Sequence, residues 1–292
     1  MARLSDRHPA GPPGDWFVDD RCIDCDAARQ VAPGLIARNP GDGVSVFLRQ
    51  PSTADEIAMA WRAVKVCPTR SVGNAAQHRP ETPPFPQPLG DEVYRLGHNA
   101  RSSFGAHSYL VRRPAGNLMV DAPRWTREVA EPVAEMGGVD HILLSHRDDV
   151  ADAERYATRF GARVWIHADD REAAPYSTDI VEGVDATSVT DGVVAFPVPG
   201  HTKGSTLFLV DGHLLFSGDS LSWNPDKQRL NAFRNACWYS WSAQTASLGR
   251  FAAGDLPFDR LFCGHGWNHD LDAESFNRLL TELVDRMADN PA

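Results

Sequence analysis

Four short patches of the sequence carry histidine or aspartate side chains of the kind that bind metal ions. They contain His146, His201, Asp219 and His265. Each patch follows an apolar, strand-like run, at 139–144, 193–198, 214–216 and 261–263 in turn. Ligands and metals converge where the strands of an α/β sheet end, so we expect these side chains to meet. Imidazole and carboxylate groups are good ligands for zinc or iron, and the pattern therefore predicts a metal site.

Several aspartates near these patches extend the predicted site. A bound metal would lower the pKa of water to about 7 and so supply hydroxide at neutral pH. Asp219 can bridge two cations where two are bound. Asp148 and Asp152 follow His146 closely, and we expect them to serve as further ligands or as the base. Asp121 follows another apolar run, and we expect it to orient a ligand or a loop from behind.

The cysteines form a second group of interest near the N-terminus. The chain has five, which are Cys22, Cys25, Cys67, Cys237 and Cys263. The odd count argues against a disulfide framework, whereas a CxxC pair such as Cys22–Cys25 is typical of a metal or redox site. Cys67 ends a helix predicted over 54–66, because the following Pro68 disfavours helix at the residue before it. Thr53 with Glu56 forms a capping box at the start of that helix.

The elements that must position these residues fall into two units. Residues 73–88 contain five prolines and almost no apolar periodicity, which indicates an extended linker between units at 1–72 and 89–292. The small unit has strand-like runs at 16–18 and 44–48. The larger unit alternates predicted strands with helices near 126–136, 151–160 and 273–287. This alternation indicates two sheets covered on the outside by helices.

Composition limits the classes of function. The 292 residues are 42% hydrophobic, and the formal net charge is −10, which argues against nucleic acid as a partner. No apolar run approaches the roughly 20 residues that span a bilayer. The N-terminus lacks the apolar core of a signal peptide. We therefore expect a cytoplasmic protein with a small-molecule substrate and no membrane partner.

The metal patches resemble, in the correct order, the motifs of the metallo-β-lactamase fold superfamily. His146 resembles the first His of its HxHxDH signature, and residues 199–202 resemble its PGHT motif. Asp219 resembles its bridging Asp, and His265 its final His. The resemblance covers about residues 92–270. It implies an αββα sandwich with metals in a cleft at one edge of the sheets, and a hydrolase; a minority of the family are di-iron oxidoreductases or RNA-processing nucleases.

The sequence departs from this family in the loop after His146. Asp148 stands where the family has its second His. The following Asp-His pair falls on Val150 and Ala151, or on Asp152 and Ala153 with an insertion of two residues, and we adopt the second alignment because it keeps an Asp. The resemblance then implies one site at His146 and His201 with Asp148 or Asp149, and a second with three ligands, Asp152, Asp219 and His265. Such carboxylate-rich sites suit iron, manganese or magnesium as well as zinc.

The cysteine unit resembles a single-cluster bacterial ferredoxin over about residues 14–72. That family binds one 4Fe–4S cluster through CxxCxxC and a distant Cys-Pro. Cys22, Cys25 and Cys67 match, but Ala28 stands at the third cysteine position. Three thiolates imply a 3Fe–4S cluster, or a 4Fe–4S cluster completed by Asp24 or Asp26. The alternative is that the cluster is lost and the fold kept as a scaffold.

Three functions follow from these observations. The first is a metal-dependent hydrolase of a small-molecule ester, thioester or lactone, with Asp148 or Asp152 as base. The second is a non-haem iron oxidoreductase fed with electrons by the iron–sulfur unit, together with a redox partner. The third is a non-catalytic binding or scaffold protein, because both ligand sets are incomplete.

Overall fold

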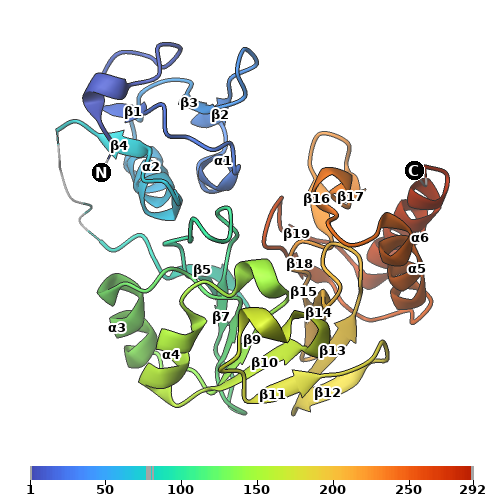
Figure 1. Cartoon of the computed structure of the whole chain (residues 1–292). Coiled ribbons are helices and arrows are strands. Elements are labelled where there is room, and N and C mark those ends of the chain that lie inside the picture. The colour runs from blue at the N-terminus through green and yellow to red at the C-terminus, as the bar shows by residue number, and fades with distance from the viewer. Residues whose placement is uncertain (1, 77–79, 81, 291–292) are drawn as a thin grey trace. The chain divides into compact units, whose positions relative to one another are not determined.

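The computed structural model describes residues 2–76, 80 and 82–290, which form two compact units (Figure 1). Unit 1 comprises Met1–Leu110 and Pro123–Gly137, and unit 2 comprises Val111–Ala122 and Gly138–Ala292. Strand β7, Tyr109–Val111, contains the first boundary between them. Strands also occupy both ends of the linker predicted at 73–88, and its residues 77–79 and 81 lie outside the described part of the chain.

Unit 1 is a small α+β assembly of short elements. The antiparallel pairs are β1 with β4, β2 with β3, and β5 with β6. Their bounds are Trp16–Val18 (β1), Ile36–Arg38 (β2), Ser45–Phe47 (β3), Val72–Asn74 (β4), Gln87–Gly90 (β5) and Val93–Arg95 (β6). The helices are Ala27–Val31 (α1), Ala54–Val66 (α2) and Arg127–Glu135 (α3), with a 3-10 turn η1 at Leu4–Asp6.

Helix α2 begins and ends at the predicted residues. Thr53 Oγ1 accepts a hydrogen bond from the Glu56 backbone N–H at 3.3 Å. The Glu56 carboxylate accepts the backbone N–H of Ser52 at 2.8 Å, one residue before the partner that a capping box would use. Cys67 leaves the helix in an extended conformation, with φ −63° and ψ 116°, as the following Pro68 requires. Buried Ala60, Ala63 and Val66 face a core shared with α1.

Unit 2 contains four parallel strands of one sheet and a second, mixed sheet. Strands β8, β9, β10 and β11 pair in parallel, and helix α4 connects β9 to β10. Their bounds are Leu118–Val120 (β8), His141–Leu143 (β9), Ala153–Phe160 (α4), Arg163–His167 (β10) and Asp179–Val181 (β11). Two 3-10 turns lie at the ends of these strands, Arg147–Asp149 (η2) after β9 and Ala168–Ala173 (η3) after β10.

The mixed sheet has the strand order β12-β13-β14-β15-β18-β19. Its strands are Thr187–Thr190 (β12), Val193–Pro197 (β13), Thr206–Val210 (β14), Leu214–Phe216 (β15), Arg260–Phe262 (β18) and His269–Asp270 (β19). Ser222–Asn224 (β16) pairs with Arg229–Asn231 (β17), and a 3-10 turn (η4) follows at Arg234–Ala236. The last helices are Trp241–Ala252 (α5) and Ala273–Ala288 (α6).

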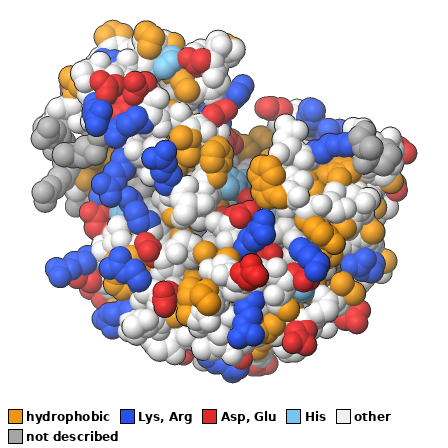
Figure 2. Space-filling model, viewed as in Figure 1, with side chains coloured by type: hydrophobic (Ala, Val, Ile, Leu, Met, Phe, Trp, Pro, Cys, Tyr) orange, Lys and Arg blue, Asp and Glu red, His pale blue; other side chains and the backbone are white. Residues whose placement is uncertain are grey.

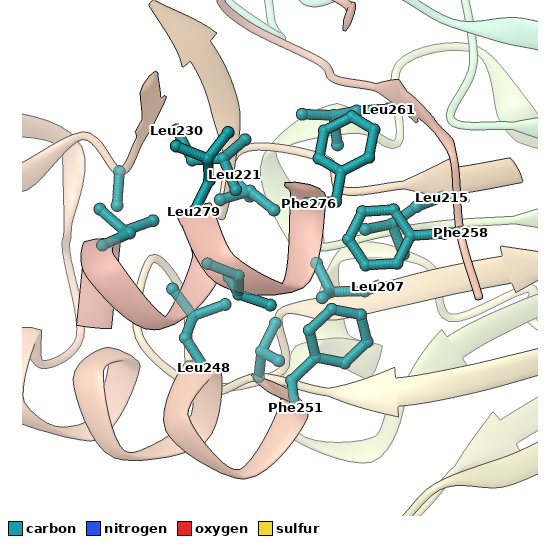
Figure 3. Packing of buried hydrophobic residues seen from close by; sticks show 14 of the residues in the cluster. Leu207, Leu215, Leu221, Leu230, Leu248, Phe251, Phe258, Leu261, Phe276 and Leu279 are labelled. Atoms are coloured by element: carbon teal, nitrogen blue, oxygen red, sulfur yellow. The ribbon is translucent and has the colours of Figure 1, made fainter. Parts of the chain in front are cut away.

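Helices α5 and α6 cover one face of the mixed sheet through a large apolar cluster (Figure 3). Leu248 and Phe251 of α5 and Phe276 and Leu279 of α6 pack there, against leucines of β14, β15 and β18. In α6 the buried positions recur every three to four residues, which is the period of a helix with one apolar face. This packing anchors β15 and β18, the strands that precede Asp219 and His265.

Acidic and basic side chains are interspersed on the face of the molecule drawn in Figure 2. Within the described residues, no helix is both long and apolar enough to cross a membrane.

Candidate metal centre and cysteine site

Three of the predicted ligands meet in unit 2. The ligand atoms of His146, His201 and Asp219 all lie within 4.8 Å of one another, and all three residues are buried. Each imidazole Nε2 approaches the carboxylate, at 3.8 Å from His146 and 3.7 Å from His201 to Asp219 Oδ2. The three residues follow β9, β13 and β15 respectively, so the expectation that strand ends would bring them together matches the geometry.

A cation fits the donor atoms that face this point. His146 Nε2 and His201 Nε2 are buried and make no hydrogen bond. A buried polar atom without a partner costs free energy on the order of 1–3 kcal/mol. Two imidazole nitrogens and a carboxylate form a donor set that zinc and iron both accept. His146, His201 and Asp219 would therefore hold the metal.

Asp121 and Ser145 orient His146 from behind. Ser145 donates its backbone N–H to Asp121 Oδ1 at 2.8 Å and its hydroxyl to Asp121 Oδ2 at 2.9 Å. The same hydroxyl oxygen lies 2.9 Å from His146 Nδ1. Because the hydroxyl hydrogen is already donated to Asp121, this oxygen accepts a hydrogen bond from the Nδ1–H of His146. Nε2 is thus left with a free lone pair that faces His201 and Asp219. Burial raises the pKa of Asp121 to about 7.

His265 joins the group through Asp219. Its Nδ1 lies 2.9 Å from both carboxylate oxygens of Asp219. Burial raises the pKa of Asp219, but the charges of His265, His146 and His201 lower it more, so its net pKa lies well below the ordinary value. Asp219 therefore stays ionised, as a ligand must.

The three aspartates after His146 occupy different places. Asp148 is 40% exposed, with Oδ2 at 3.4 Å from His201 Nε2 and 3.9 Å from His146 Nε2. Asp152 is the half-buried residue before α4. Within the described residues it does not belong to the group of close ligand atoms formed by His146, His201 and Asp219. Asp149 is buried, and neither of its carboxylate oxygens has a hydrogen-bond partner.

The sequence offered Asp149 only as an alternative to Asp148 in the site of His146 and His201, whereas in the structure its carboxylate faces Asp219. A methyl group placed on Gly264 would lie 3.0 Å from Asp149 Oδ2 and 2.7 Å from Asp219 Oδ1, so both carboxylates face the same point. Burial, followed by the charges of Asp219 and Asp121, raises the pKa of Asp149 well above its usual range. A second cation between Asp149, Asp219 and His265 would satisfy these carboxylates. The Asp148–Asp149 pair was the one available signal, and spacing alone does not say which of the two turns inward.

A buried carboxylate on η3 ties the two histidine loops together. Asp170 accepts the backbone N–H of Arg147 at 3.1 Å, next to His146. It also accepts the hydroxyl of Thr202 at 2.5 Å, next to His201, and the backbone N–H of Gly204 at 3.2 Å. One side chain thus sets the separation of the loops that carry both imidazoles.

The variant Asp170→Asn should weaken metal binding without removing a ligand. We expect a loss of about 10- to 100-fold in metal affinity, the usual effect of changing a residue that positions ligands. A competition titration against a chromophoric chelator measures it. Asp169→Asn, which removes the part-exposed carboxylate that pairs with Lys203 and approaches His167, is the matched control. Equal affinities for the two variants would refute the positioning role of Asp170.

Unit 1 contains the three predicted cysteine ligands, and each sulfur accepts a backbone N–H. Ser71 N donates to Cys67 Sγ at 3.2 Å and Ser45 N to Cys22 Sγ at 3.4 Å, and Ala27 N donates to Cys25. Burial, followed by the neighbouring Cys67 and Cys22, raises the pKa of Cys25 to about 12. Amide donors to sulfur stabilise thiolates, and such hydrogen bonds help to set the potentials of iron–sulfur clusters. The three side chains therefore fit a cluster.

Ala28, Asp24 and Asp26, the positions expected to supply a fourth ligand, either lack a donor atom or are engaged in ion pairs. Ala28 is buried on α1 and has no donor atom. Asp24 forms an ion pair with Arg38, at 2.9 Å, and Asp26 forms one with Arg29. Three cysteine sulfurs are thus the donors that unit 1 presents at this site within the described residues.

Comparisons with known proteins agree with both halves of this description. Residues 18–74 match the family model described as the 4Fe-4S single cluster domain of ferredoxin I. A metallo-β-lactamase from Hirschia baltica superimposes on 68% of this chain and 96% of its own, with TM-score 0.52 and 14% identity. The mono-zinc form of FIM-1 from Pseudomonas aeruginosa superimposes on 68% of this chain and 94% of its own, with TM-score 0.51 and 16% identity. This chain has the metallo-β-lactamase fold, and its residues 18–74 match a single-cluster ferredoxin domain.

The predicted fold class, an αββα sandwich preceded by a small ferredoxin-like domain, is confirmed. In sequence, a hydroxyacylglutathione hydrolase from Acidiphilium cryptum is 29% identical over 167 residues, covering 54% of this chain and 63% of the relative. A protein of the same name from Fuscovulum blasticum is 30% identical over 154 residues, covering 51% and 57%. The chain spans less than two thirds of the curated relatives that it matches.

Proposed function

We propose that this metallo-β-lactamase-fold protein is a metal-dependent hydrolase of a small-molecule ester, thioester or lactone. The main support for this proposal is the buried group of His146, His201 and Asp219. In this group both imidazole Nε2 atoms face the carboxylate and have no hydrogen-bond partner. The names of the two curated relatives, both hydrolases, support this reaction class.

The chain's own residues divide the work of this site. A divalent metal, when bound, supplies Lewis-acid chemistry, because it lowers the pKa of water toward about 7 and polarises a substrate carbonyl. Asp121 and Ser145 hold His146 in the tautomer that presents Nε2. Asp148 is placed to accept a proton, because it is part-exposed and lies within 4 Å of both imidazoles. The neighbouring His201 lowers the pKa of Asp148, so that this carboxyl is ionised at neutral pH.

Asp148 is therefore our candidate base in preference to Asp152. Asp149, His265 and Asp219 are the residues that we assign to a second cation. Their three donors include two carboxylates, so iron or manganese would suit that position as well as zinc.

A second candidate function rests on the ferredoxin domain. The three backbone donors to Cys22, Cys25 and Cys67 support a bound cluster, and three cysteine ligands, with Ala28 at the remaining cysteine position of the motif, suit a 3Fe–4S cluster. Cys22, Cys25 and Cys67 would hold the cluster, which would supply one-electron redox chemistry, and His146 and His201 would hold an iron ion. The protein would then be an oxidoreductase.

One anaerobic preparation separates these proposals. Zinc, iron and acid-labile sulfide are measured per chain, and hydrolysis of a phenyl ester, a thioester and a lactone is assayed on the same sample. Metal at about one ion or more per chain with hydrolysis of one of these substrates supports the first proposal. Iron and sulfide with absorption near 400 nm and no hydrolysis support the second. Absence of both metal and sulfide contradicts both and leaves a non-catalytic scaffold.

A further inference from the structure

An exposed aromatic pair lies beside His201 in unit 2. Trp238 is 62% exposed and Tyr239 is 51% exposed, although both are large apolar side chains. The ring centroids of Trp238 and His201 are 6.2 Å apart, at 55° between the ring planes. A side chain so placed forms part of whatever surface surrounds a molecule held at His201.

The backbone of this segment is fixed to the metal-binding loop. Trp238 N donates to His201 O at 2.9 Å, and Tyr239 N donates to the carbonyls of both Gly200 and His201 at 3.2 Å. Ser240 N donates to Gly200 O at 3.1 Å, and the Ser240 hydroxyl then caps α5 by accepting Ala243 N. Three consecutive residues are thus bonded to two consecutive carbonyls.

The loop at Gly200 also packs closely against helix α5. A methyl group on Gly200 would lie 2.1 Å from Gln244 Cβ, so the loop lies directly against α5. Because the Trp238 backbone is hydrogen-bonded to this packed loop, the exposure of Trp238 does not come from a loose segment. The ring is displayed at a set distance from a metal ligand.

The chemistry of this rim favours an apolar group. Lys203 lies near Tyr239, but its charge is engaged by Asp169 at 2.7 Å. The two aromatic rings therefore offer stacking and apolar contact rather than a free charge.

We infer that Trp238 forms an acyl-group subsite that selects substrates with an aromatic or bulky apolar group next to the reacting carbonyl. This inference rests on the proposed hydrolase and specifies its substrate class. With the carbonyl at His201, an aryl group would stack on the Trp238 ring, whereas an acetyl group would not reach it.

The test compares two carboxylates as probes of the zinc-loaded full chain. Phenylacetate and acetate offer the same carboxylate, and only phenylacetate carries a ring. We expect tighter binding of phenylacetate, and a loss of about five- to tenfold of that preference in Trp238→Ala, the scale of one aromatic pair. Trp238→Phe should keep most of the preference. Val184→Ala, another exposed hydrophobic side chain of unit 2, is the matched control and should keep all of it.

The outcomes separate this inference from the proposed function. An absent preference in the parent protein, or an equal preference in Trp238→Ala, overturns the subsite. If the preference depends on Trp238 but phenylacetyl and acetyl esters, the matching thioesters and a lactone are all left intact, the subsite stands and the hydrolase proposal fails. If both thioesters are hydrolysed with the same kcat/KM in parent and Trp238→Ala, the hydrolase stands and the subsite fails.

Discussion

The His201→Ala variant should lose both the bound metal and the hydrolytic activity while it keeps its fold. His201 supplies one of the three atoms in the donor group, and its removal leaves one imidazole and one carboxylate. Changes to residues that only orient ligands cost about 10- to 100-fold in metal affinity, so the loss of a ligand should cost more than about a hundredfold. Without the metal, water returns to its pKa of about 15.7, and the activity should fall to background.

Metal content by atomic emission and hydrolysis rates are measured on the same samples. The matched control is His213→Ala, in the turn between β14 and β15, where the histidine approaches only a backbone carbonyl of the turn through Nδ1. The control should keep metal and activity. A His201→Ala protein that holds metal at the parent level and hydrolyses at the parent rate would refute the assigned centre.

The Gly105→Ala variant should abolish cluster assembly in unit 1. Gly105 has φ +91°, and a methyl group there would lie 2.9 Å from Cys25 Sγ and 3.1 Å from Pro68 Cγ. The backbone of Gly105 cannot move freely away from Cys25, because its carbonyl accepts a hydrogen bond from Asn99 Nδ2 at 2.6 Å. The added methyl group would therefore displace a ligand sulfur.

The matched control is Gly34→Ala in the same unit. Gly34 also has a positive φ, +73°, but a methyl group there meets nothing within 4 Å. Both variants carry the backbone strain of a non-glycine residue at positive φ, on the order of 1 kcal/mol, and only Gly105→Ala adds the contact with sulfur. Acid-labile sulfide and absorption near 400 nm are the measurements. Retention of both signals in Gly105→Ala, or their equal loss in the two variants, would count against this role of Gly105.

The sequence predicted much of the architecture because strong local signals agreed with the fold. Helix α2 carries an N-terminal cap at Thr53 and a stop at Pro68, and its bounds match the prediction of 54–66. Helix α6 has an apolar face with a regular period and was predicted at 273–287. Helix α5 was missed, since Gly249 and several Ser and Thr residues weaken its helical signal. Its stability comes from packing of Leu248 and Phe251, which sequence does not show.

The candidate site divides in the same way. His146, His201 and Asp219 follow apolar strands, and convergence of strand ends is enough to predict that they meet. Which aspartate of the loop after His146 turns inward depends on the three-residue turn η2. In that turn Asp149 is buried and Asp148 is part-exposed, so the side chains of two adjacent residues point in opposite directions. The role of Asp152 stays a prediction.

The clamp formed by Asp170 implies an order of events during folding. It joins segments separated by 23 residues at Arg147 and by 32 residues at Thr202, and Asp219 meets His265 across 46 residues. Contacts of such long sequence separation close late, because the chain entropy of the intervening loops must be lost first. Metal added to the refolding chain should therefore leave the folding rate nearly unchanged and lower the unfolding rate. The ion would then increase the kinetic stability of the folded protein.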